Sequence, residues 1–477
     1  MSLRNAPRPS IKFRAGVLAA ALALACGHAA SAHAENLMDA YRQALTSDPL
    51  LQQAEAQSRI GEAGAAQSRA LLLPQINGSV NFQDSHGSSG QTLLTQTTTG
   101  QQYFSTTGHS QGRTRTEAVG LDQVLFDLGK FEQWRSGKAS ARASESQYVA
   151  AQQDLILRVA QAYFTVLTDE DNLKFAEANE KALKKQLDQA QAKYDVGFAA
   201  ITDVVDAKAQ HDTAVAQVIA AKNAVFNDRQ ALAQITGQKP GTLEALTDQL
   251  PMQPPQPDDM EDWVKTALAS NPSLEAQREL VESAQHGLSA ARAGRLPTLG
   301  ASVSYSRRPS WGPGATGDLA GLPPNVQQVL RADSRSNDTT VGLLLSVPLF
   351  AGGGIHARIK QNIAQRDQAQ DVLEQDRRSV VSNTRNAFNA IKAGISSVEA
   401  QKQAVISSKT ALDATQAGYQ IGTRTIVDLL IAQQNYFLAQ SNYSQARHAL
   451  VINQLNLKFA AGTLSVKDLE TVNALLQ

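Results

Sequence analysis

Long stretches without proline constrain the fold of this chain more than any other feature of its sequence. None of the sixteen prolines lies between Pro74 and Pro240, and none follows Pro348. Glycine is also sparse there, and the helix-favouring residues Ala, Gln, Lys and Leu are abundant. The pattern predicts long helices at about 128–196, 200–237, 353–420 and 425–461. The longest would reach about 100 Å at roughly 1.5 Å per residue, a length typical of coiled coils.

Alternating segments argue against the simplest interpretation of these helices, which is a soluble helical bundle. Apolar and polar residues alternate most clearly from Ile76 to Phe82 and from Leu299 to Tyr305. A period of two indicates a strand with one apolar and one polar face. We therefore predict strands at about 75–84, 113–126, 298–307 and 339–350. The Gly- and Ser-rich stretches between them, 84–112 and 307–338, are predicted to be exposed loops.

The N-terminus has the pattern of a secretory signal peptide. A basic stretch precedes an apolar run from Ala15 to Ala25, and Ala32-His33-Ala34 forms a small-residue cleavage site. This apolar run is too short to cross a bilayer, which needs about 20 residues. We predict that residues 1–34 are removed, with lipidation at Cys26 as the alternative. No later run approaches 18 apolar residues, so a membrane-embedded form would have to be a β-barrel.

Composition excludes several classes of site. The lone Cys26 rules out a disulfide framework, a cysteine-type zinc site and an iron–sulfur cluster. The formal net charge of zero gives no positive field for nucleic acid. The histidines are scattered, and Gly352-Gly353-Gly354 lacks the Lys-Ser/Thr of a phosphate loop. We therefore expect no catalytic site, cofactor or metal, and an exported enzyme is disfavoured.

The sequence indicates that the two halves of the chain are copies of one unit. Leu73-Pro74 corresponds to Leu296-Pro297 at an offset of 223 residues, and other pairs keep nearly the same spacing. This predicts structural repeats at 35–260 and 261–477, each with a helix, two strands and two long helices. Four strands per chain cannot close a barrel. The chain should therefore oligomerise, with eight strands and a filled interior in a dimer, or twelve and a lumen in a trimer.

Two short motifs carry a family resemblance. The stretch from Val196-Gly197 to Val204, and the stretch from Gly418-Tyr419 to Asp428, resemble the tip motifs of the outer membrane factor family, the TolC-like channels. The start Glu35-Asn36-Leu37-Met38 resembles the mature start of that family and favours cleavage over lipidation. The resemblance runs from about Glu35 to the end of the chain.

The resemblance implies a mixed α and β fold and a transport function. The expected assembly is a trimeric 12-stranded outer-membrane β-barrel, four strands per protomer, continued by a long α-helical coiled-coil barrel in the periplasm. The expected function is an exit duct for drug efflux and type I protein secretion. Its partners would be outer membrane lipid, a periplasmic adaptor protein, and an inner-membrane efflux pump or ABC transporter. A non-conducting structural coiled-coil protein of the envelope is the alternative.

The resemblance also implies a gate at the periplasmic tip. Asp203 would accept hydrogen bonds from Tyr419 in the same protomer and from Arg424 of a neighbouring one, with Thr202 beside it. Gln186 matches a residue of the same tip network. Docking of an adaptor would break these links and open the channel.

The remaining implied roles concern the pore and the docking face. Asp428 matches an acidic ring that narrows the pore, but Ile431 stands where the family has a second aspartate. Gln416 stands where the family has a glutamate. With both acidic matches missing, we expect weaker cation selectivity and weaker cation block than in a tip with two acidic rings. Gly197 and Gly422 mark the helix–helix turns, which the resemblance makes the adaptor docking face.

Overall fold

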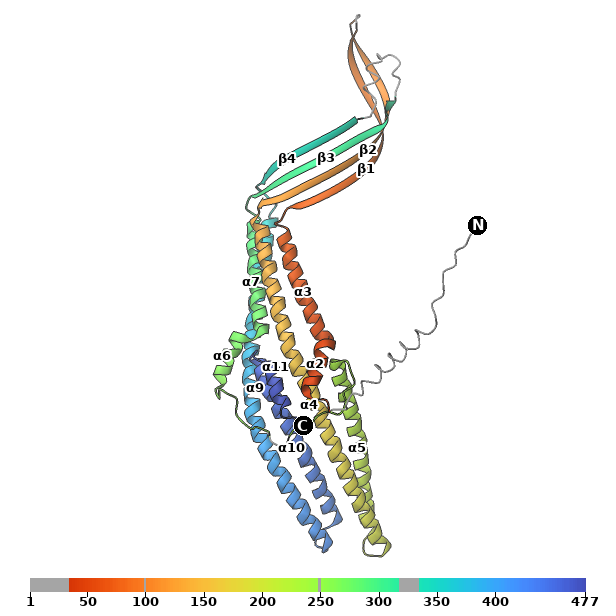
Figure 1. Ribbon diagram of the computed structural model, residues 1–477, viewed down its shortest axis with the longest axis vertical. Helices are drawn as coiled ribbons and strands as arrows, with labels where there is room; N and C mark the ends of the chain where they lie inside the picture. Colours follow the sequence, from red (N-terminus) through yellow and green to blue (C-terminus); the bar gives the residue numbers. More distant parts are fainter. Residues whose placement is uncertain (1–33, 98–99, 248–249, 317–333) are drawn as a thin grey trace, which may run out of the picture. The chain divides into compact units, whose positions relative to one another are not determined.

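The computed structural model describes residues 34–97, 100–247, 250–316 and 334–477. Cys26 and all but the last residue of the predicted signal peptide lie outside these ranges. The main elements follow one another in the same order in each half of the chain (Figure 1). They are α2 (Leu37–Ser47), α3 (Pro49–Ala70), β1 (Gln75–Thr97), β2 (Gly100–Phe126), α4 (Leu128–Asp195), α5 (Ile201–Thr236), α6 (Met260–Ser270), α7 (Pro272–Ala293), β3 (Thr298–Thr316), β4 (Ser334–Ser346), α9 (Gly354–Gln420), α10 (Ile426–Ala460) and α11 (Val466–Asn473).

Glycines in the left-handed region end several of the long helices. Gly237 follows α5 with a φ of +74°, and Gly462 lies just beyond α10 with a φ of +73°. A glycine within a helix acts differently. A Cβ on Gly137 of α4 would lie 2.6 Å from the hydroxyl oxygen of Ser68 in α3. Its missing side chain therefore lets these two helices approach closely, and α4 continues through it.

The strands form one antiparallel sheet in the order β1-β2-β3-β4. Residues directly opposite one another across such a sheet share a face. One row across all four strands is apolar and consists of Ile76, Leu121, Val303 and Val341. The next row, on the other face, has small or polar residues and consists of Asn77, Gly120, Ser304 and Thr340. The register therefore gathers the alternating residues into one apolar and one polar face.

The predicted loops at 84–112 and 307–338 are wrong over most of their described lengths. β1 continues to Thr97 and β2 begins at Gly100, while β3 reaches Thr316 and β4 begins at Ser334. A cross-strand contact within the extension supports it, since Ser85 Oγ donates to the carbonyl oxygen of Gly112 at 3.0 Å. Polarity and glycine content suggested loops, but the ladder satisfies the backbone without an apolar face. Residues 317–333 lie outside the described ranges.

The described chain divides into two compact units, each made of segments from both halves. One comprises residues 54–149 and 272–379, and holds the sheet with the helix ends that adjoin it. In this unit His286 Nδ1 of α7 lies 2.7 Å from Glu132 Oε2 of α4. The other unit comprises the described residues up to 53 together with 150–271 and 380–477. Its core includes a cluster in which α6 packs on α9 and α10: Trp263, Ala267, Phe388, Ile391, Val398, Leu450, Leu457 and Ala461.

Among the described helices, none has a stretch apolar and long enough to span a bilayer.

Candidate gate at the helical hairpin turns

The hairpins α4–α5 and α9–α10 reverse direction through turns with the same key backbone conformation (Figure 1). Gly197 and Gly422 both have a φ of +81°, in the left-handed region that is costly for a side chain. In the first turn, the amide of Phe198 donates to the carbonyl of Lys193 at 2.8 Å and closes the end of α4. A Cβ on either glycine would meet no other described atom within 4 Å. Backbone conformation, not crowding, therefore favours glycine in both turns.

The second turn is tightened around the carbonyl of Gly418. This oxygen accepts from the amide of Thr423 at 2.9 Å, from its hydroxyl at 3.1 Å and from the amide of Arg424 at 3.3 Å. A Cβ on Gly418 would lie 2.8 Å from Cγ of Arg424. The absence of a side chain at Gly418 therefore leaves room for the Arg424 side chain beside the end of α9.

Asp428, the predicted pore residue, takes part in a capping box at the start of α10. Its Oδ2 accepts from the backbone amide of Thr425 at 3.0 Å and from the Thr425 hydroxyl at 2.9 Å. The amide of Asp428 donates back to that hydroxyl at 3.1 Å. These bonds, with the positive charge of Arg424, hold the pKa of the Asp428 carboxyl below its usual value of 3.8. The carboxylate thus has a local structural role that the resemblance did not indicate.

Asp203, the predicted gate residue, occupies the corresponding position at the start of α5. The residue before that helix is Ala200, which has no side-chain oxygen to form a cap. The amide of Asp203 donates to the carbonyl of Ala200 at 3.1 Å. Its carboxylate has no hydrogen-bond or ion-pair partner in the part of the chain that the structure describes. The carboxylate is therefore free to accept bonds from another molecule.

Tyr419 lies at the end of α9 against a cluster shared by three other helix segments. The cluster consists of Leu183, Ala190, Val204, Ala207, Ala214, Ile426 and Leu430, with Leu187 packed against it. The ammonium of Lys193 lies 4.3 Å from the centre of the Tyr419 ring, a cation–π contact. The Tyr419 hydroxyl makes no hydrogen bond to Asp203 within the described chain. The predicted Tyr419–Asp203 link therefore stays a prediction for the assembled protein.

The other predicted residues lie at or near the same hairpin ends. Thr202, Arg424 and Gln416 are exposed, and Gln186 on α4 is half-buried. Ile431 is 49% exposed, one turn beyond Asp428 on α10. Within the described ranges, the side chains of these five residues form no hydrogen bond or ion pair. Their assigned roles remain predictions.

Two residues of this site were missed at the level of sequence. Thr425 was detectable, because Thr followed three residues later by Asp before an apolar run is a capping signature. Lys193 was not, because its contact with Tyr419 joins α4 to α9 across more than 200 positions and no local pattern indicates such a pairing.

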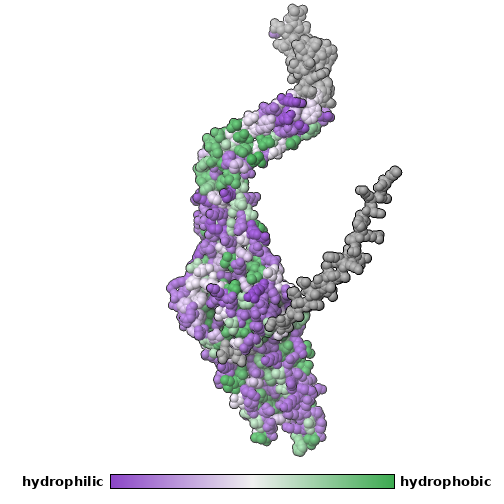
Figure 2. Space-filling view, in the orientation of Figure 1, coloured by the Kyte–Doolittle hydropathy of each residue, from purple (hydrophilic) through white to green (hydrophobic). Residues whose placement is uncertain are grey.

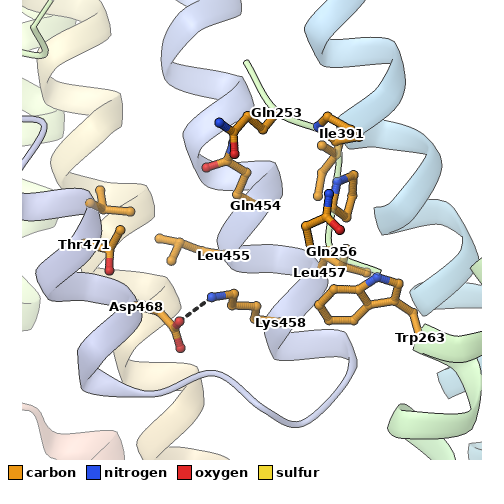
Figure 3. A pocket seen from close by; sticks show the side chains of 13 residues that line it. Gln253, Gln256, Trp263, Ile391, Gln454, Leu455, Leu457, Lys458, Asp468 and Thr471 are labelled. Atoms are coloured by element: carbon orange, nitrogen blue, oxygen red, sulfur yellow. Dashed lines mark hydrogen bonds and ion pairs between the residues drawn. The ribbon is translucent and has the colours of Figure 1, made fainter. Parts of the chain in front are cut away.

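A separate cavity of about 250 Å³ lies between α9, α10, α11 and the segment 253–256 (Figure 3). Its apolar wall includes Trp263, Leu455 and Leu457. Its charged groups, Lys458 and Asp468, pair with each other. This pairing leaves little charge to recognise a ligand, and we assign no function to the cavity.

Comparison with known proteins places the chain in a family. It matches the family described as "Outer membrane efflux protein" over residues 40–238 and 263–463. It is 35% identical to outer membrane protein TolC of Salmonella enteritidis over 450 residues, covering 94% of this chain and 86% of the relative. It is 29% identical to the alkaline protease secretion protein AprF of Pseudomonas aeruginosa, covering 93% of this chain and 88% of that protein.

A solved structure shares the fold. The Campylobacter jejuni CmeC outer membrane channel superimposes with a TM-score of 0.71 at 18% identity, covering 93% of this chain and 90% of that one. The predicted family and the predicted outer-membrane location are thus confirmed. The chain belongs to the outer membrane efflux protein family and acts in efflux at the outer membrane.

Proposed function

We propose that three copies of this chain form a continuous duct for drug efflux and type I protein secretion. The observation that carries the proposal is the open four-stranded sheet. Within the described chain, β1 pairs only with β2 and β4 pairs only with β3, so each outer strand has an unpaired edge. Unpaired edges invite pairing with another chain. Three sheets joined edge to edge would give twelve strands and a lumen, whereas eight strands fill with side chains.

The two faces of the sheet support a lipid-exposed barrel. Val341 and Ile76, on the apolar face, are 74% and 70% exposed in the single chain. Hydrophobic side chains gather over the strand ends nearest the helices (Figure 2). Such exposure favours contact with outer membrane lipid, and the polar face would then line the lumen.

Exposed apolar stripes support the helical part of the same trimer. On α5 they recur at helical spacing and consist of Ile201, Val205, Val215, Ile219 and Phe226. On α10 the exposed apolar residues are Val427, Ile431 and Leu438. A helix with apolar residues on an uncovered stripe needs another helix against it. Neighbouring protomers would supply these helices and complete the coiled-coil barrel. Its two hairpins per protomer would come from the predicted repeats 35–260 and 261–477.

The tip residues support a gate between protomers. Asp203 and the Arg424 guanidinium are unpaired within the described chain, so they are available for a charge-assisted bond across the interface. Tyr419 and Thr202 lie on the same hairpins, with Gln186 and Gln416 one or more turns away. The gate would close the tube until a periplasmic adaptor docks.

The turns themselves favour adaptor docking. Gly197 and Gly422 bring the chain through tight reversals, and the flanking Phe198 and Ile421 are 85% and 78% exposed. Apolar side chains so exposed at a loop tip suit a protein partner. The adaptor would link the duct to an inner-membrane efflux pump or ABC transporter. The similarity to AprF, named for alkaline protease secretion, supports the secretion role.

Planar-bilayer recording of the purified protein tests the proposal. We expect a low resting conductance that rises several-fold in Arg424→Ala and Tyr419→Phe, because each substitution removes a gate bond. Arg377→Ala, on α9 but paired within its own helix with Glu374 at 2.7 Å, is the control and should leave conductance unchanged. A protein without channels would overturn the duct. Unchanged currents in both tip variants would overturn the gate alone.

A further inference from the structure

The two tip aspartates occupy equivalent positions but have different partners. Asp203 and Asp428 are each the third residue of the helix that follows a hairpin turn. The residue before each helix has nearly the same backbone conformation, with φ and ψ of −79° and 152° at Ala200 and −84° and 163° at Thr425. The hairpins therefore differ mainly in whether this N-cap residue carries a hydroxyl.

At the second hairpin, the N-cap fixes the aspartate through three hydrogen bonds. The Thr425 amide and hydroxyl both donate to Oδ2 of Asp428, at 3.0 and 2.9 Å, and the hydroxyl accepts from the Asp428 amide at 3.1 Å. Two of these bonds involve backbone amides, so the carboxylate is tied to the helix end itself. Both bonds to the carboxylate use one oxygen, which leaves Oδ1 able to face a cation.

We propose that the N-cap residues assign the two tip aspartates to different tasks. Thr425 acts as the positioning residue that holds Asp428 as a fixed pore carboxylate, while Ala200 leaves Asp203 free for the gate. This inference rests on the proposed duct and on the predicted pore role of Asp428. It adds a reason why two residues in equivalent positions perform unlike functions.

The positioning role follows from what Thr425 does to the charge. Hydrogen bonds donated to a carboxylate favour its ionised form, in agreement with the lowered pKa of Asp428. A fixed anion repeated around a three-fold axis attracts multivalent cations more strongly than one that samples several rotamers. With Ile431 in place of a second acidic residue, the ring depends on Asp428 alone for its negative charge at that level.

Block by hexaamminecobalt(III) in planar bilayers tests the role of Thr425. Thr425→Val keeps the branched shape but removes the hydroxyl, and Thr425→Ser restores the hydroxyl. We expect Thr425→Val to raise the half-blocking concentration roughly tenfold, as the loss of a charge-assisted bond implies. Thr425→Ser should remain within about twofold of the unsubstituted protein.

A pH profile separates positioning from general damage to the tip. In Thr425→Val, the pH at which block is half lost should rise part of the way toward the ordinary carboxyl range, because the ionised form loses the hydroxyl donor while the backbone amide remains. An unchanged half-blocking concentration and pH midpoint in Thr425→Val would overturn the positioning role. Block of the Asp428→Asn variant tests the predicted pore role of Asp428 separately. If block persists in Asp428→Asn, the pore role of Asp428 fails, whatever Thr425 does.

The reciprocal substitution tests the other hairpin. Ala200 is exposed and already has the N-cap conformation, so Ala200→Thr should draw Asp203 into a capping box and away from the gate. We expect a resting conductance several-fold above that of Ala200→Val, which adds similar bulk without a hydroxyl. Equal currents in the two variants would overturn this half of the inference. The tip gate itself is tested independently by Arg424→Ala.

Discussion

The two helical hairpins share a turn backbone and differ in how they use their side chains. Gly197 and Gly422 have the same φ of +81°, and each turn leads into a helix with aspartate at its third position. In one hairpin that aspartate caps its own helix, and in the other it has no partner in the described chain. The comparison teaches that glycine sets the path of the turn, whereas the N-cap residue decides what the acidic side chain can do.

The largest expected effect on stability distinguishes two glycines that lie away from the hairpin turns. Gly237 follows the end of α5, and Gly462 follows the end of α10. A Cβ on Gly462 would lie 2.5 Å from the backbone Cα of Asn271, whereas one on Gly237 would meet the side chain of Ser47 at 2.8 Å. We expect Gly462→Ala to cost about 3–5 kcal/mol of unfolding free energy, from the left-handed backbone and the clash. Gly237→Ala should cost less, about 2 kcal/mol.

Thermal unfolding in detergent, followed by circular dichroism, measures both. Gly64→Ala in α3 is the control, because a Cβ there meets no described atom within 4 Å and alanine favours the helix. Equal losses of unfolding free energy in Gly237→Ala and Gly462→Ala would show that the backbone clash at Gly462 relaxes without cost.

Alanine substitution of the turn glycines should destabilise the two hairpin turns equally. Because Gly197 and Gly422 share their conformation and have open space around them, alanine at either one should cost about 1–2 kcal/mol. Hydrogen exchange of the turn peptides measures the loss for each hairpin separately. A loss in only one hairpin would break the equivalence on which the comparison depends.

Of the two helix starts that follow the hairpin turns, acidification should loosen the capped start of α10 and not that of α5. The pKa of Asp428 is lowered in the folded chain, so its contribution is complete above pH 3.8 and is lost as the pH falls through the lowered value. We expect amide exchange in the first turn of α10 to accelerate over that window, after correction for intrinsic rates. Thr425→Val should weaken this dependence and move it to higher pH, because the hydroxyl donor is lost while the backbone amide remains. A dependence unchanged in size and position would assign it to another group.

The smallest expected effect concerns the tyrosines before the turns. Tyr419 has the Lys193 ammonium over its ring at 4.3 Å, whereas Tyr194 occupies the corresponding place in the first hairpin. Lys193→Gln should weaken the end of α9 by about 0.5–1 kcal/mol, seen as faster amide exchange there. Lys184→Gln, on the same helix and paired with Asp188, is the control. Equal exchange in both variants would remove the cation–π contact as a support of Tyr419.

Sequence was most informative where local rules decide the structure. The proline-free stretches and the glycines at 197 and 422 placed the long helices, because helix ends depend on nearby residues. The stretch 84–112 was misjudged, because polar residues there form paired strands whose stability comes from the partner strand rather than from composition. The candidate site was predicted from motifs and stays a prediction, whereas the Lys193–Tyr419 contact depends on tertiary packing, which no motif indicates. The predicted repeat boundaries and the gate bonds remain predictions.

The capping box at Asp428 has a consequence for the open channel. A carboxylate secured by a residue three positions earlier moves as one body with its own helix end. If the hairpins swing apart on opening, bonds between protomers break, but the Thr425–Asp428 bonds travel with the helix. If Asp428 has its predicted pore role, its carboxylate is therefore in place before assembly and stays in place through each opening, so the open pore should attract cations as strongly as the closed one.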